Sequence, residues 1–153
     1  MIYNNALDLI GNTPILNLKE AGYPNVFVKL EKANPGGSIK DRAALYMING
    51  AEEKGILNKD SVLVEATSGN TGIALAMAGK LKGYKVIIIM PDTMSIERRQ
   101  LVKAFGAELI LTEGAKGMAG SIEKANELLD KNPNYICLGQ FDNEDNPRAH
   151  YET

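Results

Sequence analysis

Lys85-Val86-Ile87-Ile88-Ile89-Met90 is the stretch of this sequence that decides the fold. Its four central residues are apolar and β-branched, with no polar residue between them. A strand with one side in solvent alternates polar and apolar residues, whereas an unbroken apolar run is typical of a parallel strand buried on both faces. Pro91 and Asp92 end the run. The stretch therefore predicts a parallel strand with helices packed on each side.

Strands and helices are expected to alternate on both sides of this stretch. From Lys40 to about Lys54, the apolar residues Ala44, Met47 and Ile48 recur at the spacing of one helix face. Further strands are expected over Ile15–Leu18, Val26–Leu30, Ser61–Glu65, Glu108–Leu111 and Tyr135–Leu138, and further helices over Thr71–Lys82, Ile96–Phe105 and Met118–Asp130. This alternation with short connections predicts right-handed βαβ units, and hence an α/β fold of three layers, αβα, around a mainly parallel sheet.

Composition and charge exclude several classes of protein. A chain of 153 residues with 44% hydrophobic and 24% charged residues is ordinary for one globular domain. The net charge of −2 favours neither a nucleic acid nor an anionic membrane as partner, and no apolar run approaches the roughly 18 residues of a membrane span. One histidine and one cysteine cannot supply the usual metal-ligand set. We therefore expect a cytoplasmic protein without nucleic-acid, membrane or metal partners.

Cys137 and His150 are both expected to be unreactive. Cys137 lies in the last predicted strand, which favours a buried, inert thiol. His150 follows Asn146-Pro147-Arg148, a pattern typical of a loop, so we expect a solvated side chain.

Lys40 is the first candidate for chemistry. It follows Asn34-Pro35-Gly36-Gly37-Ser38-Ile39 and stands at the start of a predicted helix. An ammonium there faces the positive end of the helix dipole, and the two glycines let the backbone approach a ligand closely. A neutral amine at this point can form a Schiff base with an aldehyde. A surface lysine paired with Asp41 is the alternative, and the pattern leaves both open.

The loop Thr67-Ser68-Gly69-Asn70-Thr71-Gly72 is the second candidate site, between a predicted strand and a predicted helix. Unsatisfied N–H groups at a helix N-terminus make a favourable site for anions. The hydroxyls and the Asn70 amide add further hydrogen-bonding groups. The loop predicts a site for the α-carboxylate of an amino acid; a phosphate site and a plain capped turn are the alternatives.

Together these motifs resemble the N-terminal half of cysteine synthase (O-acetylserine sulfhydrylase), a pyridoxal-phosphate enzyme of the tryptophan-synthase-β fold group, fold type II. The resemblance runs in fixed order through nearly the whole chain. It rests on Ile10–Pro14, Asn34–Arg42, Glu65–Ala74, Met90-Pro91, Met94-Ser95, Glu97-Arg98-Arg99, Gly106–Leu109, Gln140-Phe141, Asn143 and Asn146-Pro147. Lys82-Gly83-Tyr84, Pro91-Asp92 and residues 145–151 resemble the B-type isozyme.

The resemblance implies a role for each motif. Lys40 would hold the pyridoxal phosphate and move the substrate α-proton, and Asn70 would hydrogen-bond the 3′-oxygen of the cofactor. Residues that would hold the substrate carboxylate are Thr67, Ser68, Gly69, Thr71 and Gln140. The implied transferase reaction, in cysteine biosynthesis, is a β-replacement in which sulfide or thiosulfate displaces the acetate of O-acetylserine. A homodimer and a serine acetyltransferase partner are also implied.

The same resemblance implies the domain organisation. Residues 1–34 are expected to form a segment whose strands join a second, larger domain, and 35–145 the small α/β domain with the lysine and the substrate loop. Residues 146–153 would begin the second domain. The glycine-rich cradle for the cofactor phosphate, and the serine that faces the pyridine nitrogen, belong to that second domain and are missing from this sequence. We therefore expect this chain to be inactive by itself.

Two other functions stay open at this point. An enzyme like cystathionine β-synthase shares the lysine and the Ser-Gly-Asn-Thr-Gly loop, although Glu97-Arg98-Arg99 and Gln140-Phe141 favour cysteine synthase. The other open function is that of a non-catalytic fragment, which binds an amino-acid-like anion or a partner protein. Covalent attachment of the cofactor to Lys40 would separate an enzyme from such a fragment.

Overall fold

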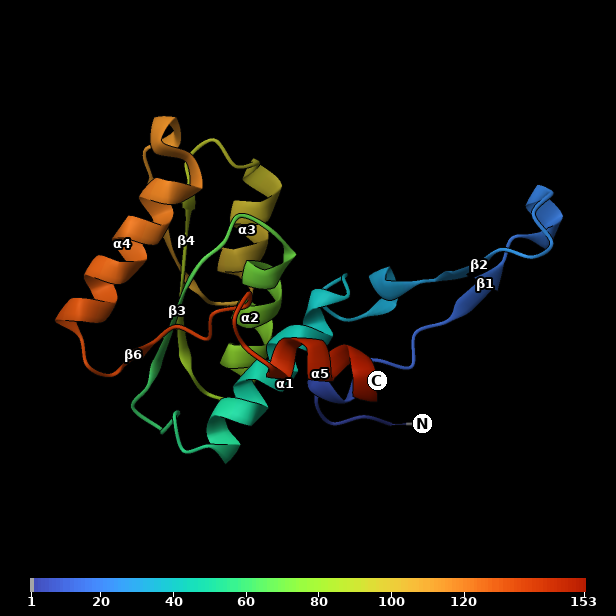
Figure 1. The fold of residues 1–153 in the computed structure, drawn as a ribbon, viewed down its shortest axis with the longest axis horizontal. Coiled ribbons are helices and arrows are strands. Elements are labelled where there is room, and N and C mark those ends of the chain that lie inside the picture. Colours follow the sequence, from blue (N-terminus) through green and yellow to red (C-terminus); the bar gives the residue numbers. More distant parts are fainter. Residues whose placement is uncertain (1) are drawn as a thin grey trace.

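The computed structural model describes residues 2–153, and its main body is a four-stranded parallel sheet between two layers of helices (Figure 1). The strands are β3 (Val62–Ala66), β4 (Lys85–Pro91), β5 (Glu108–Thr112) and β6 (Tyr135–Ile136), in the order β5-β4-β3-β6. The helices are α1 (Lys40–Glu53), α2 (Asn70–Leu81), α3 (Ile96–Ala104), α4 (Gly117–Lys131) and α5 (Asp145–Glu152). The predicted three-layer αβα fold is therefore confirmed.

β4 shows why the helices must lie on both sides of the sheet. Val86 and Ile88 belong to the core cluster that α1 and α2 complete, whereas Ile87 and Ile89 belong to the cluster that α4 covers. All four side chains are buried. Each buried side chain of this size stabilises the fold by roughly 1.5–3 kcal/mol, so β4 is stable only with both layers in place. The prediction from the apolar run is confirmed.

A two-stranded antiparallel hairpin extends away from this body (Figure 1). Its strands are β1 (Ile15–Asn17) and β2 (Phe27–Lys29), with Leu16 opposite Val28. Every residue of both strands is exposed, including the apolar side chains of Leu16 and Val28. The hairpin therefore contributes nothing to the core of the α/β body. The domain boundaries expected from the sequence stay a prediction.

The structure corrects two expectations near the C-terminus. The last strand, β6, ends at Ile136, so the predicted strand over Tyr135–Leu138 is too long at its C-terminal end. Cys137 is exposed and not buried as predicted, whereas Leu138 is buried in the core. Only the first half of the predicted strand finds backbone partners, on β3. The loop predicted around His150 is also wrong, because α5 includes this residue, with its side chain at the surface. Proline at the third position of a helix needs no backbone donor, so Pro147 does not prevent α5 from forming.

α5 packs against α1 through a buried carboxylate. Asp145 lies at the first turn of α5, and its Oδ2 accepts a hydrogen bond of 2.8 Å from Lys54 Nζ. Its Oδ1 accepts one of 2.9 Å from Arg148 Nη1, and Arg148 stacks over the ring of Tyr46 at 5.5 Å. A Cβ atom at Gly50 of α1 would overlap the Asp145 carboxylate. Glycine at position 50 is therefore a condition for this helix contact.

Gly50→Ala is predicted to destabilise the protein by about 1–3 kcal/mol, the usual range for overpacking. Alanine is otherwise favoured over glycine in a helix interior by about 1 kcal/mol, so a loss must come from the overlap with Asp145. Thermal and urea unfolding would measure it. In an Asp145→Ala background the same substitution should be neutral or stabilising, and a raised melting temperature of Gly50→Ala alone would contradict this account.

Candidate active site

The carboxyl end of β3 leads directly into the predicted substrate loop. Thr67 is buried, and its N–H donates to the Ile89 carbonyl at 3.0 Å, which extends the pairing with β4 by one residue. Gly69 precedes the first helical residue of α2, and the Gly72 N–H donates to its carbonyl at 3.1 Å. The open crevice at the carboxyl ends of parallel strands is where α/β proteins bind their ligands. The loop therefore has the expected location for a binding site.

Gln140 joins this loop from a distant part of the chain. The Thr71 hydroxyl donates to Gln140 Oε1 at 2.7 Å across 69 residues of sequence. Asn146 Nδ2 donates to the Gln140 carbonyl at 2.7 Å. The amide nitrogen of the Gln140 side chain has no hydrogen-bond partner within residues 2–153, so it is available to a ligand. Thr71 and Gln140, which the resemblance assigns to the same substrate carboxylate, are thus in contact.

The other predicted loop residues differ in exposure. Ser68 is half-buried, and its carbonyl accepts a hydrogen bond of 3.3 Å from Arg98 Nη1 of α3. Asn70 is exposed at the first position of α2, with its side chain accessible to a ligand. Arg98 belongs to the Glu97-Arg98-Arg99 motif of the resemblance, but its contact with the substrate loop is a finding of the structure, because a surface arginine does not show in the sequence which carbonyl it will meet.

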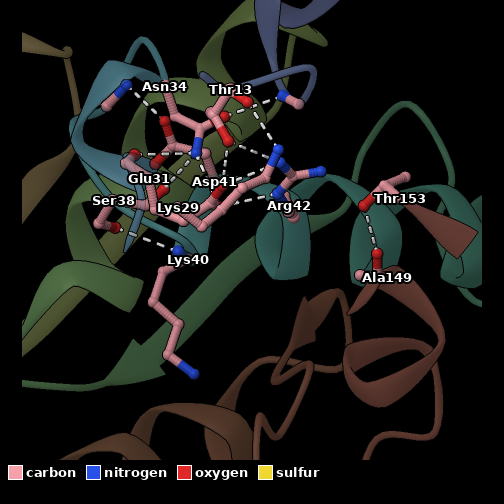
Figure 2. Close-up of polar contacts among 12 residues, drawn as sticks. Thr13, Lys29, Glu31, Asn34, Ser38, Lys40, Asp41, Arg42, Ala149 and Thr153 are labelled. Atoms are coloured by element: carbon pink, nitrogen blue, oxygen red, sulfur yellow. Dashed lines mark hydrogen bonds and ion pairs between the residues drawn. The ribbon is translucent and has the colours of Figure 1, made fainter. Parts of the chain in front are cut away.

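Lys40 is the first residue of α1, and its backbone N–H donates to Ser38 Oγ at 3.1 Å. Figure 2 shows its side chain leaving the surrounding polar cluster, and Nζ makes no hydrogen bond or ion pair among the described residues. The predicted alternative, an ion pair with Asp41, is wrong because that carboxylate faces Gly36 instead. A half-buried, unpaired amine is thus available to an aldehyde, which fits an imine-forming cofactor.

The Asp41 carboxyl group fixes the turn that precedes Lys40. It is fully buried, and Oδ2 accepts a hydrogen bond of 2.5 Å from the Gly36 N–H. A Cβ atom at Gly36 would lie 2.5 Å from Asp41 Oδ1, so a larger residue cannot make this turn. Oδ1 itself has no partner in the described part of the chain. Desolvation, opposed by the Gly36 N–H and aided by Glu31, raises the pKa of Asp41 to about 6.

A second carboxylate, Glu31, ties the N-terminal segment to α1 (Figure 2). Arg42 Nε and Nη2 donate to its two oxygens at 2.8 and 2.9 Å, and the Thr13 hydroxyl also donates to it. The hydrogen bonds from Arg42 are the main reason that the pKa of Glu31 is lowered to about 2. Asn34 adds a link, since its Oδ1 accepts from the Gly11 N–H at 2.8 Å. This cluster holds α1, and hence Lys40, in place.

His150 of α5 is a further residue near Lys40 that the sequence did not indicate. Desolvation, and then the positive charges of Lys40 and Arg42, lower its pKa. His150 comes close enough to feel these charges because α5 packs against α1, which the sequence pattern did not predict. Within residues 2–153 there is no cluster of histidine, cysteine, aspartate and glutamate able to hold a metal ion. The same part of the chain has no helix that is long and apolar enough to cross a membrane.

Asp41→Asn is predicted to change how stability depends on pH. The folded pKa of about 6 exceeds the ordinary 3.8, so the folded chain binds this proton more tightly and the free energy of unfolding falls as pH rises from about 4 to 6. Asparagine keeps the acceptor for Gly36 and removes the titration. The variant should therefore gain up to about 3 kcal/mol relative to the parent between pH 4 and 7.

Urea unfolding of both proteins across this pH range would measure the difference. Asp60→Asn, at an exposed position, is the matched control for the loss of one negative charge. Parallel pH profiles for the parent and Asp41→Asn would contradict the account of Asp41.

Comparison with known proteins identifies the family. The profile described as "Pyridoxal-phosphate dependent enzyme" matches residues 6–153. A protein named cysteine synthase from a Flavobacterium strain is 55% identical over 155 residues, which cover 100% of this chain and 50% of that protein. The chain thus spans about half the length of the curated relatives that it matches.

Solved structures agree with this result. The crystal structure of a hydrogen sulfide-producing enzyme from Fusobacterium nucleatum superposes with a TM-score of 0.91 at 51% identity, over 100% of this chain and 51% of that one. An O-acetylserine dependent cystathionine β-synthase from Helicobacter pylori gives the same TM-score at 38% identity, over 100% of this chain and 52% of the other. The chain therefore belongs to the family of pyridoxal-phosphate dependent enzymes.

Proposed function

We propose that this chain carries the lysine and the amino-acid site of a cysteine synthase. The observation that carries the proposal is the unpaired amine of Lys40, held at the start of α1 by the buried clusters around Asp41 and Glu31. The relatives named cysteine synthase are identical to this chain at about half of the aligned positions, which supports the same reaction. The substrate would be O-acetylserine: its bond from the β-carbon to acetate breaks, and a bond from that carbon to sulfur forms.

Lys40 would have two tasks in this reaction. Its amine would anchor pyridoxal phosphate, which supplies an electron sink for negative charge at the substrate α-carbon. Once displaced by the substrate amine, the same Nζ would take the α-proton. Asn70, exposed at the first position of α2, would donate a hydrogen bond to the 3′-oxygen of the cofactor. Holding Lys40 at a fixed helix start restricts where its amine can reach.

The α-carboxylate of the substrate would bind at the N-terminus of α2. A helix leaves backbone N–H groups unsatisfied at its start, and an anion is favoured there. The residues beside these N–H groups are Thr67, Ser68, Gly69 and Thr71. Gln140 would complete the site, because its side-chain nitrogen is unpaired and its oxygen already accepts from the Thr71 hydroxyl. Together these groups orient the substrate with its α-carbon toward the cofactor.

The alternative enzyme, a cystathionine β-synthase, shares the fold and the same site elements. Gln140-Phe141 and Glu97-Arg98-Arg99 support the assignment as cysteine synthase. The B-type assignment, with thiosulfate as a second sulfur donor, remains part of the proposal. The homodimer, the serine acetyltransferase partner and the cytoplasmic location that the resemblance implies stay predictions.

The test is a pyridoxal-phosphate titration of the chain, followed by borohydride reduction and peptide mass mapping. We expect a yellow complex before reduction, loss of the colour with borohydride and the reduced cofactor on Lys40, and at least a tenfold loss of label in Lys40→Ala. Lys59→Ala, at an exposed site, is the matched control and should keep the label. Label absent or scattered over many lysines would contradict cofactor binding by this chain and would favour a non-catalytic fragment.

A further inference from the structure

Glu65 is a buried carboxylate that the proposed reaction does not use. It lies on β3, two residues before Thr67, with 6% of its surface exposed. Its neighbours Val62, Leu63 and Val64 are buried and apolar, as expected for a strand inside three layers. A charged side chain in such a strand costs stability unless hydrogen bonds satisfy it. The partners of Glu65 therefore indicate what it does.

Those partners are consecutive residues of one irregular segment. The Cys137 thiol donates to Glu65 Oε2 at 3.6 Å, and the backbone N–H groups of Leu138, Gly139 and Gln140 face the same carboxylate. Successive N–H groups that converge on one point form a typical cradle for an anion. Here the anion is a side chain of the protein itself, so it fixes the course of the segment that follows β6.

Gln140 is consequently held at three points. Its N–H faces the Glu65 carboxylate, its carbonyl accepts from Asn146, and its side-chain oxygen accepts from the Thr71 hydroxyl. Between β6 and α5 the segment is irregular, and Gly139 adopts a φ of +64°. Two further hydrogen bonds hold its backbone, from Asn143 Nδ2 to the Leu138 carbonyl at 2.7 Å and from the Asp142 N–H to the Gly139 carbonyl at 3.1 Å, but both come from within the segment itself. Of the three contacts, the one from Glu65 is the only link from Gln140 to the strand that carries the substrate loop.

We propose that Glu65 is a positioning residue, which fixes Gln140 against Thr71 and thereby sets the geometry of the amino-acid carboxylate site. The inference rests on the proposed function, since it assigns Gln140 to the substrate. Strand, loop and Gln140 then move as one unit, because Glu65 joins the 138–140 segment to the strand that leads into Thr67. Glu65 itself touches neither the substrate nor the cofactor.

The first test needs no catalytic activity. Glu65→Gln keeps the size of the side chain but replaces one acceptor with an amide donor, which faces N–H groups. We expect the backbone amides of Leu138, Gly139 and Gln140 to exchange with deuterium at least tenfold faster, as measured by NMR. Glu108→Gln is the matched control, since this exposed glutamate lies on the opposite edge of the same sheet.

The second test separates positioning from general stability. In protein loaded with pyridoxal phosphate, Glu65→Gln should raise the Kd for O-acetylserine at least tenfold, with the Kd for the cofactor changed by less than about threefold. Added to Gln140→Ala, the same substitution should have no further effect on the Kd for O-acetylserine, because the residue through which it acts is already gone. A merely structural role would lower the melting temperature and give independent effects on this Kd.

Unchanged exchange of residues 138–140, or additive effects on the Kd for O-acetylserine, would overturn the proposal. Should Glu65→Gln not fold, Glu65→Asp provides the same comparisons, since it keeps the charge and shortens the reach by one methylene. A parent protein that takes no cofactor label on Lys40 and binds no O-acetylserine would overturn the proposed function, while faster exchange in Glu65→Gln would still show that Glu65 holds the segment of Gln140. The two failures are therefore distinguishable.

Discussion

Successive residues of β4 point to opposite faces of the sheet, and every one from Val86 to Met90 must leave water. Only helices on both faces can achieve this, so each strand must be followed by a crossover helix before the next parallel strand begins. The carboxyl ends of the strands then lie along one edge of the sheet, next to the starts of the helices. The substrate loop after β3 and the start of α2 owe their place to this constraint.

Buried carboxylates hold the irregular segments around that edge. Glu31 ties the N-terminal segment to α1, Asp41 ties the turn before Lys40, and Glu65 ties the segment of Gln140. Their pKa values diverge because their partners differ. Glu31 faces the Arg42 guanidinium and its pKa is lowered, whereas Asp41 and Glu65 face mainly neutral donors, so desolvation raises theirs. One type of side chain thus serves in three electrostatic settings.

The local sequence pattern predicted most of the α/β body, because the spacing of apolar residues in β4 and α1 is visible within a few residues. The predictions are wrong where contacts between distant parts of the chain determine the local structure. The strand expected to reach Leu138 stops at Ile136, because backbone pairing with β3 ends there. The backbone N–H groups of residues 138–140 face the Glu65 carboxylate instead. α5 forms where Asn146-Pro147-Arg148 predicts a loop, and its contact with α1 depends on the space at Gly50.

The sequence by itself determined the layered fold, the helix start at Lys40 and the substrate loop after β3, because these depend on neighbouring residues and on the period of the apolar ones. It also indicated Gln140, but only through resemblance. The tertiary structure alone decided that Gln140 meets Thr71, that Asp41 faces Gly36 instead of Lys40, and that Glu65 holds Gln140. The physical reason is that a buried polar group takes whichever partner the packing brings near, and that partner can be 69 residues away.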